Sequence, residues 1–145
     1  MKQSVIATRT ILIKNDTIVI DNERKGIQPM LLTKKKLCRL AAPYNEGDMS
    51  IGYAESQSME SISSKVILLV DDRQVIILFL NFFQTKVIDH IAYARKDLTN
   101  EQLTQGFNGL DVVLRFTVQN KKWRFRILKK IVTLGKMQRE LIERL

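Results

Sequence analysis

Two neighbouring stretches near the C-terminus, Val112–Val118 and Trp123–Leu128, alternate apolar and polar residues, and every charge in them is basic. The cations are Arg115, Lys122, Arg124 and Arg126. The alternating apolar residues are Val112, Leu114, Phe116, Val118, Trp123, Phe125 and Ile127. A β-hairpin built from these stretches carries its apolar set on one face and all of its charge, which is basic, on the other. Such a basic face predicts binding of carboxylates or phosphates.

The register of this hairpin decides which cations face each other. A turn at Asn120–Lys121 sets Arg115 directly opposite Arg126, and like charges across a sheet are unfavourable. Because no Asp or Glu lies between Val112 and Leu128, relief must come from solvent, from an anionic partner, or from acids elsewhere in the fold. The candidate acids are Asp97, Glu101 and those of the Glu46–Glu60 stretch. The candidate partner-binding residues are Arg115, Lys121, Lys122, Arg124, Arg126, Lys129 and Lys130.

Catalytic chemistry has little support in the sequence, and we expect no enzyme activity, no cofactor and no metal. His90 is the single histidine and Cys38 the single cysteine, so neither a two-histidine metal motif nor a CxxC motif can form. Asp71 and Asp72 stand where a hairpin must reverse, and Asp is a preferred turn residue. The glycines match no phosphate-binding loop.

The charge of the chain is concentrated at its C-terminal end. Residues 110–145 hold ten basic and three acidic residues, which is +7 of a net charge of +9. This asymmetry predicts attraction to nucleic acid, to anionic lipid or to an acidic protein surface. Recognition of single strands by stacking is disfavoured, because Trp123 and Phe125 alternate away from the cations. Since a lone cysteine cannot form an intrachain disulfide, we expect a reducing compartment and a cytoplasmic location.

The length of 145 residues fits one domain, and we expect residues 1–145 to form it. A hairpin is predicted over Thr10–Asp21. Pro29 places any strand over Ile27–Thr33 at an edge or shortens it to Met30–Thr33. Lys65–Val70 and Val75–Phe83 are apolar at nearly every position, which predicts strands buried on both faces. Their second face needs a helix, a loop or a second subunit, so a homodimer through Val66–Phe83 is one expectation.

The remaining segments are predicted as follows. Pro43–Ser64 is a long loop with one short strand around Met49–Tyr53. Gln84–Arg95 fits a helix or a strand, and the strand is favoured. Thr99–Gly106 begins with a capping box and ends in glycine, which predicts a two-turn helix. Lys129–Leu145 carries an apolar stripe and predicts an amphipathic C-terminal helix.

The order of these elements resembles the small bacterial members of the pleckstrin-homology-like superfold. Val112–Val118 and Lys122–Ile127 correspond to its last two strands, which lead into the terminal helix. The resemblance implies an α+β fold, a bent antiparallel sheet or partly open barrel of about seven strands with the helix at one end. It also implies a scaffold that commonly binds proteins or peptides. The first hairpin here holds a single lysine, so lipid-headgroup binding is not carried over.

Two functions follow as hypotheses. The first is a noncatalytic interaction module that binds a protein or peptide partner and carries a basic C-terminal hairpin. The second is a protein that binds nucleic acid or another anionic surface through that basic face.

Overall fold

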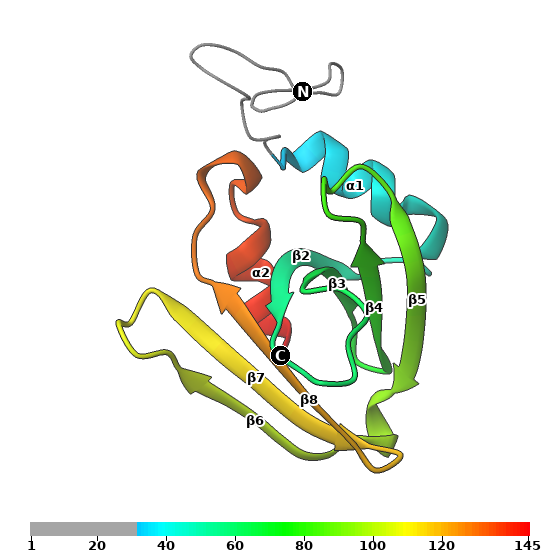
Figure 1. The fold of residues 1–145 in the computed structure, drawn as a ribbon. Helices are drawn as coiled ribbons and strands as arrows, with labels where there is room; N and C mark the ends of the chain where they lie inside the picture. The colour runs from blue at the N-terminus through cyan, green and yellow to red at the C-terminus, as the bar shows by residue number, and fades with distance from the viewer. Residues whose placement is uncertain (1–31) are drawn as a thin grey trace. The chain divides into compact units, whose positions relative to one another are not determined.

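The computed structural model describes residues 32–145. Their helices and strands, in chain order, are α1 (Lys34–Ala41), η1 (Ala42–Tyr44), β2 (Ser50–Ser56), β3 (Lys65–Val70), β4 (Gln74–Leu80), β5 (Val87–Ala94), η2 (Arg95–Asp97), β6 (Thr99–Gln105), β7 (Asp111–Val118), β8 (Lys121–Leu128), η3 (Val132–Leu134) and α2 (Met137–Arg144) (Figure 1). The hairpin predicted at Thr10–Asp21 lies outside the described residues.

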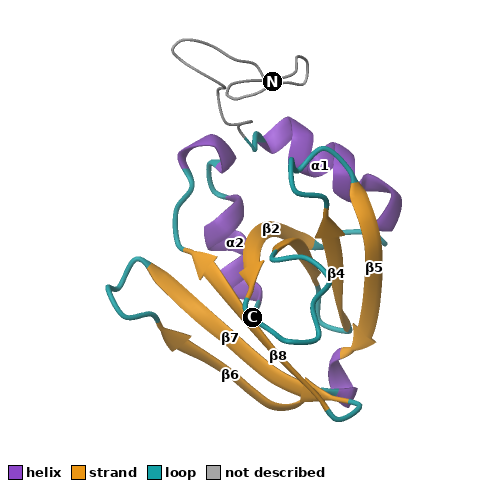
Figure 2. Cartoon of the chain, viewed as in Figure 1, coloured by secondary structure: helices purple, strands orange, loops and turns teal. Residues whose placement is uncertain are grey.

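The strands form one bent antiparallel sheet that does not close into a barrel. Its order is β5-β4-β3-β2-β8-β7-β6, so β5 and β6 are the two edges (Figure 2). With two short α-helices this confirms the α+β class and the predicted bent sheet. No helix within residues 32–145 is long and apolar enough to cross a membrane.

Strands β3 and β4 confirm the prediction of burial on both faces, but β4 ends at Leu80, so the last residues of the predicted Val75–Phe83 strand lie outside it. Alternate residues such as Leu68 and Ile77 join a core on the inner face of the bend, which also contains Trp123 and Phe125. The intervening residues, such as Ile67 and Leu78, pack in a second cluster. Both clusters are formed within the chain itself. A homodimer through Val66–Phe83 would therefore have to use Phe82 and Phe83, which are exposed.

Helix α1 covers the second face. Thr33 caps its N-terminus by accepting a hydrogen bond from the backbone N–H of Lys36, and its apolar side chains Leu37 and Ala41 lie one turn apart. Both are fully buried against the second cluster. The sequence left open whether a helix, a loop or a second subunit covers this face. In the structure a helix covers it.

Helix α2 packs on the inner face at the junction of β2 and β8. These two strands pair only at Glu55↔Arg126 and Ser56↔Phe125. Beyond that point the side chain of Gln138, which is fully buried, bridges them: its Oε1 accepts the N–H of Tyr53, and its Nε2 donates to the carbonyls of Tyr53 and Leu128. A single amide therefore takes the place of the missing ladder bonds.

Several sequence predictions were wrong. The helix predicted over Thr99–Gly106 is strand β6, because pairing with β7 outweighs the capping signal. The helix predicted over Lys129–Leu145 is α-helical only from Met137, because Gly135 adopts a positive φ of 58°. In contrast, the short strand predicted around Met49–Tyr53 within the Pro43–Ser64 loop is confirmed as β2, which extends to Ser56. The strand favoured for Gln84–Arg95 is confirmed as β5.

Candidate functional site

The hairpin of β7 and β8 has the predicted faces but a different register. Gln119 and Asn120 both adopt positive φ, 52° and 64°, as a tight hairpin turn requires. The turn therefore lies one residue earlier than predicted, and Arg115 pairs with Arg124, not with Arg126. The prediction that Arg115 faces Arg126 is wrong, although an arginine still faces Arg115.

Arg126 is neutralised on this face. Its Nε donates to Oδ2 of Asp111, and its Nη1 lies 3.2 Å from Oε1 of Glu55. The hydrogen bond to Asp111 is the main reason why the pKa of Arg126 is raised above its usual value. Glu55 belongs to the acidic stretch that the sequence pointed to, whereas Asp111 was missed.

The geometry explains why Asp111 escaped the sequence analysis. It stands opposite Leu128, and Val113 stands opposite Arg126, so Asp111 and Arg126 are diagonal neighbours on one face. This diagonal placement of Asp111 and Arg126 can be seen only when the pairing of β7 with β8 is known. Of the other predicted acids, Glu101 pairs instead with Arg95 at 2.9 Å.

Three cations of the hairpin have no such partner. Within residues 32–145, no carboxylate lies within ion-pair distance of Arg115, Lys122 or Arg124, which together we call the basic face. Arg115 donates a hydrogen bond to the neutral hydroxyl of Thr104 on β6, 3.1 Å away. Lys122 and Arg124 are exposed. The basic face is therefore a surface of uncompensated charge.

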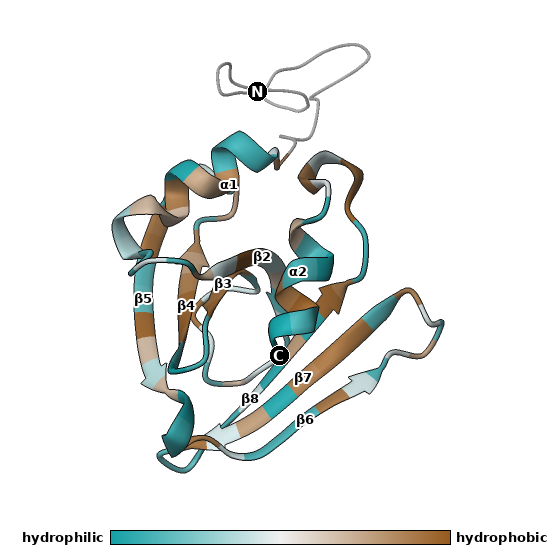
Figure 3. Cartoon of the chain, turned by 180° about the vertical axis from the view of Figure 1, so that it is seen from behind, coloured by the Kyte–Doolittle hydropathy of each residue, from teal (hydrophilic) through white to brown (hydrophobic). Residues whose placement is uncertain are grey.

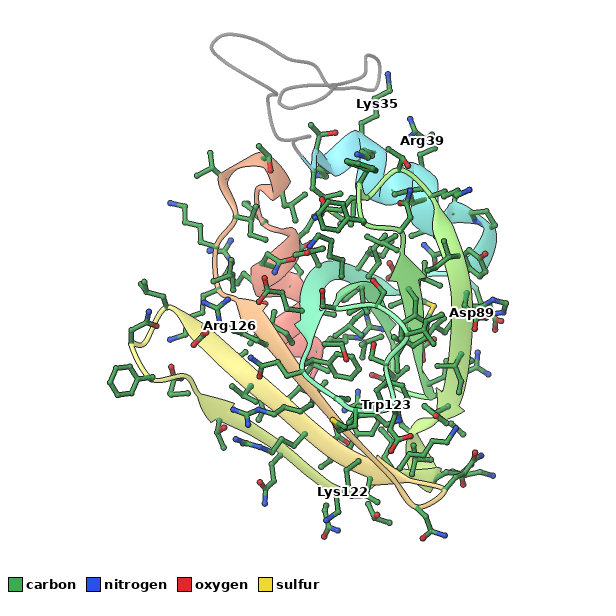
Figure 4. The ribbon with its side chains drawn as sticks, viewed as in Figure 1. Lys35, Arg39, Asp89, Lys122, Trp123 and Arg126 are labelled. Atoms are coloured by element: carbon green, nitrogen blue, oxygen red, sulfur yellow. The ribbon has the colours of Figure 1, made fainter. Side chains whose placement is uncertain are left out.

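The seven candidate residues do not form one cluster. Lys121 begins β8 beside the turn, and by the alternation of the strand it belongs to the same side as Trp123, opposite the basic face. Lys129 and Lys130 follow the opposite end of the strand, and at 3.2–3.4 Å per residue they lie roughly 25 Å from Lys121. Figure 4 shows Lys122 and Arg126 at separate positions along β8. Two surfaces must therefore be considered separately.

The aromatic residues of the hairpin lie behind the basic face. Trp123 and Phe125 are 3% and 0% exposed, and their rings stack with centroids 5.7 Å apart in the inner core. This confirms that the two rings alternate away from the cations. The basic face thus offers charge and hydrogen bonds but no ring from these two residues on which a base could stack.

The residues considered for catalysis have structural roles or stand apart. His90 packs its ring against Tyr44, with centroids 4.8 Å apart. Asp71 accepts hydrogen bonds from the N–H groups of Arg73 and Gln74, both at 2.8 Å, and so stabilises the turn between β3 and β4. Cys38 is exposed on α1. Within residues 32–145, no group of three or more His, Cys, Asp or Glu side chains is placed to hold a metal ion.

A hollow of about 460 Å³ lies between α2, the start of β2 and Lys34. Arg144 crosses its rim, donating to the carbonyl of Asp48 and the hydroxyl of Ser50, and approaches Asp72 at 3.6 Å. Glu140 and Glu143 supply opposite charge to the same walls. Because its charges are mixed, this hollow indicates no ligand class as clearly as the basic face does.

Comparisons of the chain with models of protein families, with curated proteins and with solved structures find no match. The function is therefore inferred from the geometry of the chain.

Proposed function

We propose that this protein is a noncatalytic interaction module that binds an acidic segment of a protein or peptide partner on the basic face. One observation carries the proposal: Arg115 and Arg124 stand directly opposite each other with no carboxylate on either, while Arg126 on the same strand has two. Opposed like charges lower stability by a few tenths of a kcal/mol or more. An acidic ligand removes that penalty and gains charge-assisted hydrogen bonds.

The spacing of the cations fits an extended acidic chain. Lys122 and Arg124 are two residues apart on β8, so their side chains emerge about 7 Å apart on one face. Carboxylates at alternate positions of an extended peptide have the same separation. Arg115, from the neighbouring strand, adds a planar guanidinium that can bind a carboxylate through two hydrogen bonds.

Nucleic-acid binding is the second candidate function, and the same cations support it. Three unpaired cations neutralise few phosphates, so the electrostatic contribution to such binding is small. The rings of Trp123 and Phe125 are buried and add no stacking energy. For these reasons we favour the acidic polypeptide.

The resemblance to the pleckstrin-homology-like superfold remains part of the proposal. A bent sheet of seven strands with a helix at the end of the chain supports it. The resemblance implies a scaffold that binds proteins or peptides, which agrees with the proposed role of the basic face. A cytoplasmic location likewise stays a prediction, based on the single cysteine.

The test is a binding titration with two synthetic peptides, one alternating glutamate with threonine and one with glutamine in place of glutamate. We expect salt-dependent binding of the glutamate peptide only. The variant R115Q/R124Q should weaken it about tenfold or more, since each charged hydrogen bond contributes roughly 1.5–3 kcal/mol.

The matched control is K35Q/R39Q, which removes the same charge from the exposed face of α1 (Figure 4). It should change the affinity by no more than about twofold, because surface charges beyond a Debye length of about 10 Å are largely screened. Equal losses in both double variants would contradict a local site. Binding of duplex DNA through Arg115 and Arg124, in preference to the peptide, would favour the second candidate function.

A further inference from the structure

The turn between β6 and β7 displays large apolar side chains to solvent. Phe107 is fully exposed and Leu110 is 64% exposed. The turn is nevertheless fixed by its own hydrogen bonds: Gly106 N–H donates to the carbonyl of Asp111, Gly109 N–H to that of Gly106, and Leu110 N–H to Oδ1 of Asn108. Phe107 and Leu110 thus project from an ordered turn.

The segment that follows β8 continues this surface. Lys129 N–H donates to the carbonyl of Leu110 at 3.0 Å, which joins the segment to the turn. Val132, three residues later, is 85% exposed. The turn and the segment lie along the same side of the molecule in two opposite views (Figures 1 and 3). We call Phe107, Leu110 and Val132 the apolar tip.

Apart from Asp111, which is buried and paired with Arg126, the charges beside the apolar tip have one sign. Lys129 and Lys130 precede Val132, Lys136 follows it, and neither 106–110 nor 129–139 contains an acidic residue. Within residues 32–145, no carboxylate pairs with any of these lysines. Exposed apolar side chains bordered by cations match the two layers of an anionic membrane surface, acyl chains below and phosphates above.

We propose that the apolar tip docks on an anionic phospholipid surface, with Phe107, Leu110 and Val132 entering the interfacial layer and Lys129 and Lys130 meeting lipid phosphates. A phenylalanine contributes about 150–250 Å² of contact and the other two side chains are smaller, so the three supply less than the roughly 800 Å² per partner of a stable protein interface. A bilayer accepts projecting side chains without a complementary pocket. This surface lies at the opposite end of β8 from Lys121 and Lys122. Membrane docking by the apolar tip is therefore independent of peptide binding on the basic face.

The experiment is flotation of the full chain with vesicles of phosphatidylcholine alone or mixed with phosphatidylglycerol. We expect binding to the mixed vesicles only. K129Q/K130Q should lower the partition coefficient by roughly thirtyfold, corresponding to about 1 kcal/mol for each lysine near an anionic surface. F107S/L110S should lower it by at least about tenfold.

The control is F82S/F83S, because these phenylalanines are 76% and 64% exposed on a different turn, between β4 and β5. This variant should bind as the unmodified chain does. Absence of binding to mixed vesicles, or a loss confined to F82S/F83S, would overturn the proposal.

A second readout does not depend on comparing affinities. In F107W the new indole should be quenched by brominated phosphatidylglycerol, whereas Trp123 of the unmodified chain is buried and should not be. Binding without quenching at position 107 would also overturn the proposal.

Discussion

Replacing Gln138 with leucine removes the side chain that joins β2 to the end of β8. The amide makes three hydrogen bonds, at 2.7, 2.9 and 2.9 Å, to the N–H and carbonyl of Tyr53 and to the carbonyl of Leu128. Leucine has a similar volume, so the change leaves no large cavity. It leaves three backbone groups without their partners at a site where residue 138 is fully buried.

The cost follows from those three groups. A buried backbone group left without its hydrogen bond costs about 1–3 kcal/mol, so three cost roughly 3–9 kcal/mol. Burial of the leucine side chain returns about 2 kcal/mol, which leaves a net loss centred on about 4 kcal/mol. Domains are stable by only about 5–15 kcal/mol. With a urea dependence near 2 kcal/mol per M, the unfolding midpoint should fall by about 2 M.

The assay is urea unfolding followed by circular dichroism, with hydrogen exchange at the Tyr53 amide as a local probe. Arg139→Leu is the control, because it introduces the same side chain at the next position, which is exposed, and should change stability by less than about 0.5 kcal/mol. The reasoning is refuted if Q138L unfolds at the same urea concentration as the unmodified chain, or if R139L costs as much.

Three further outcomes follow from the structure. Gly52→Ala should destabilise by about 1–3 kcal/mol in urea unfolding, since its Cβ would lie 2.6 Å from Cδ2 of Leu141 and 2.9 Å from Oε1 of Gln138. Burial opposes the ionisation of Asp71, but hydrogen bonds from two backbone N–H groups and the charges of Arg73 and Arg144 together outweigh it and lower the pKa. The stabilisation by Asp71 is therefore present at neutral pH and is lost as pH falls below about 4. Asp71→Ala should thus cost about 1 kcal/mol at pH 7 and nothing in strong acid. Burial, and after it the charge of Glu55, raises the pKa of Tyr53 to about 12. The contribution of the neutral phenol to folding stability is therefore lost as pH rises from about 10 towards 12. Tyr53→Phe should make the free energy of unfolding less dependent on pH in that range.

The parts of the fold that the sequence predicted are those with dense apolar patterns. β3 and β4 consist almost wholly of buried residues around a turn fixed by Asp71, and β8 alternates between buried residues and residues that are exposed or partly exposed. Edge strand β6 has no such pattern, because all seven of its residues are exposed. Only its pairing with β7 makes it a strand, and pairing is not visible in local sequence.

The helices also differ in how far the sequence predicts them. Leu37 and Ala41, which are buried, lie four residues apart after a capping threonine. This spacing in the sequence is a signal for α1, although no helix was predicted there. The late start of α2 depends on the positive φ of Gly135, a conformation that a helical stripe cannot reveal.

The cations of the site were predicted from alternation alone, but their partners were not. A turn one residue earlier changed the residue opposite Arg115 from Arg126 to Arg124 and placed Asp111 beside Arg126. Because Gln119 is not a typical residue for positive φ, the sequence favoured the wrong turn. Charge pairing across a sheet therefore needs the register, which the turn decides.

The central claim is that the opposed pair Arg115 and Arg124 serves binding at the expense of stability. The most direct test measures both quantities on one variant, Arg124→Gln, at low ionic strength. The account predicts that the midpoint of thermal unfolding rises by about 1–2 °C, because a repulsion of a few tenths of a kcal/mol is removed, while affinity for the glutamate peptide falls. A lower midpoint together with unchanged peptide affinity would contradict it.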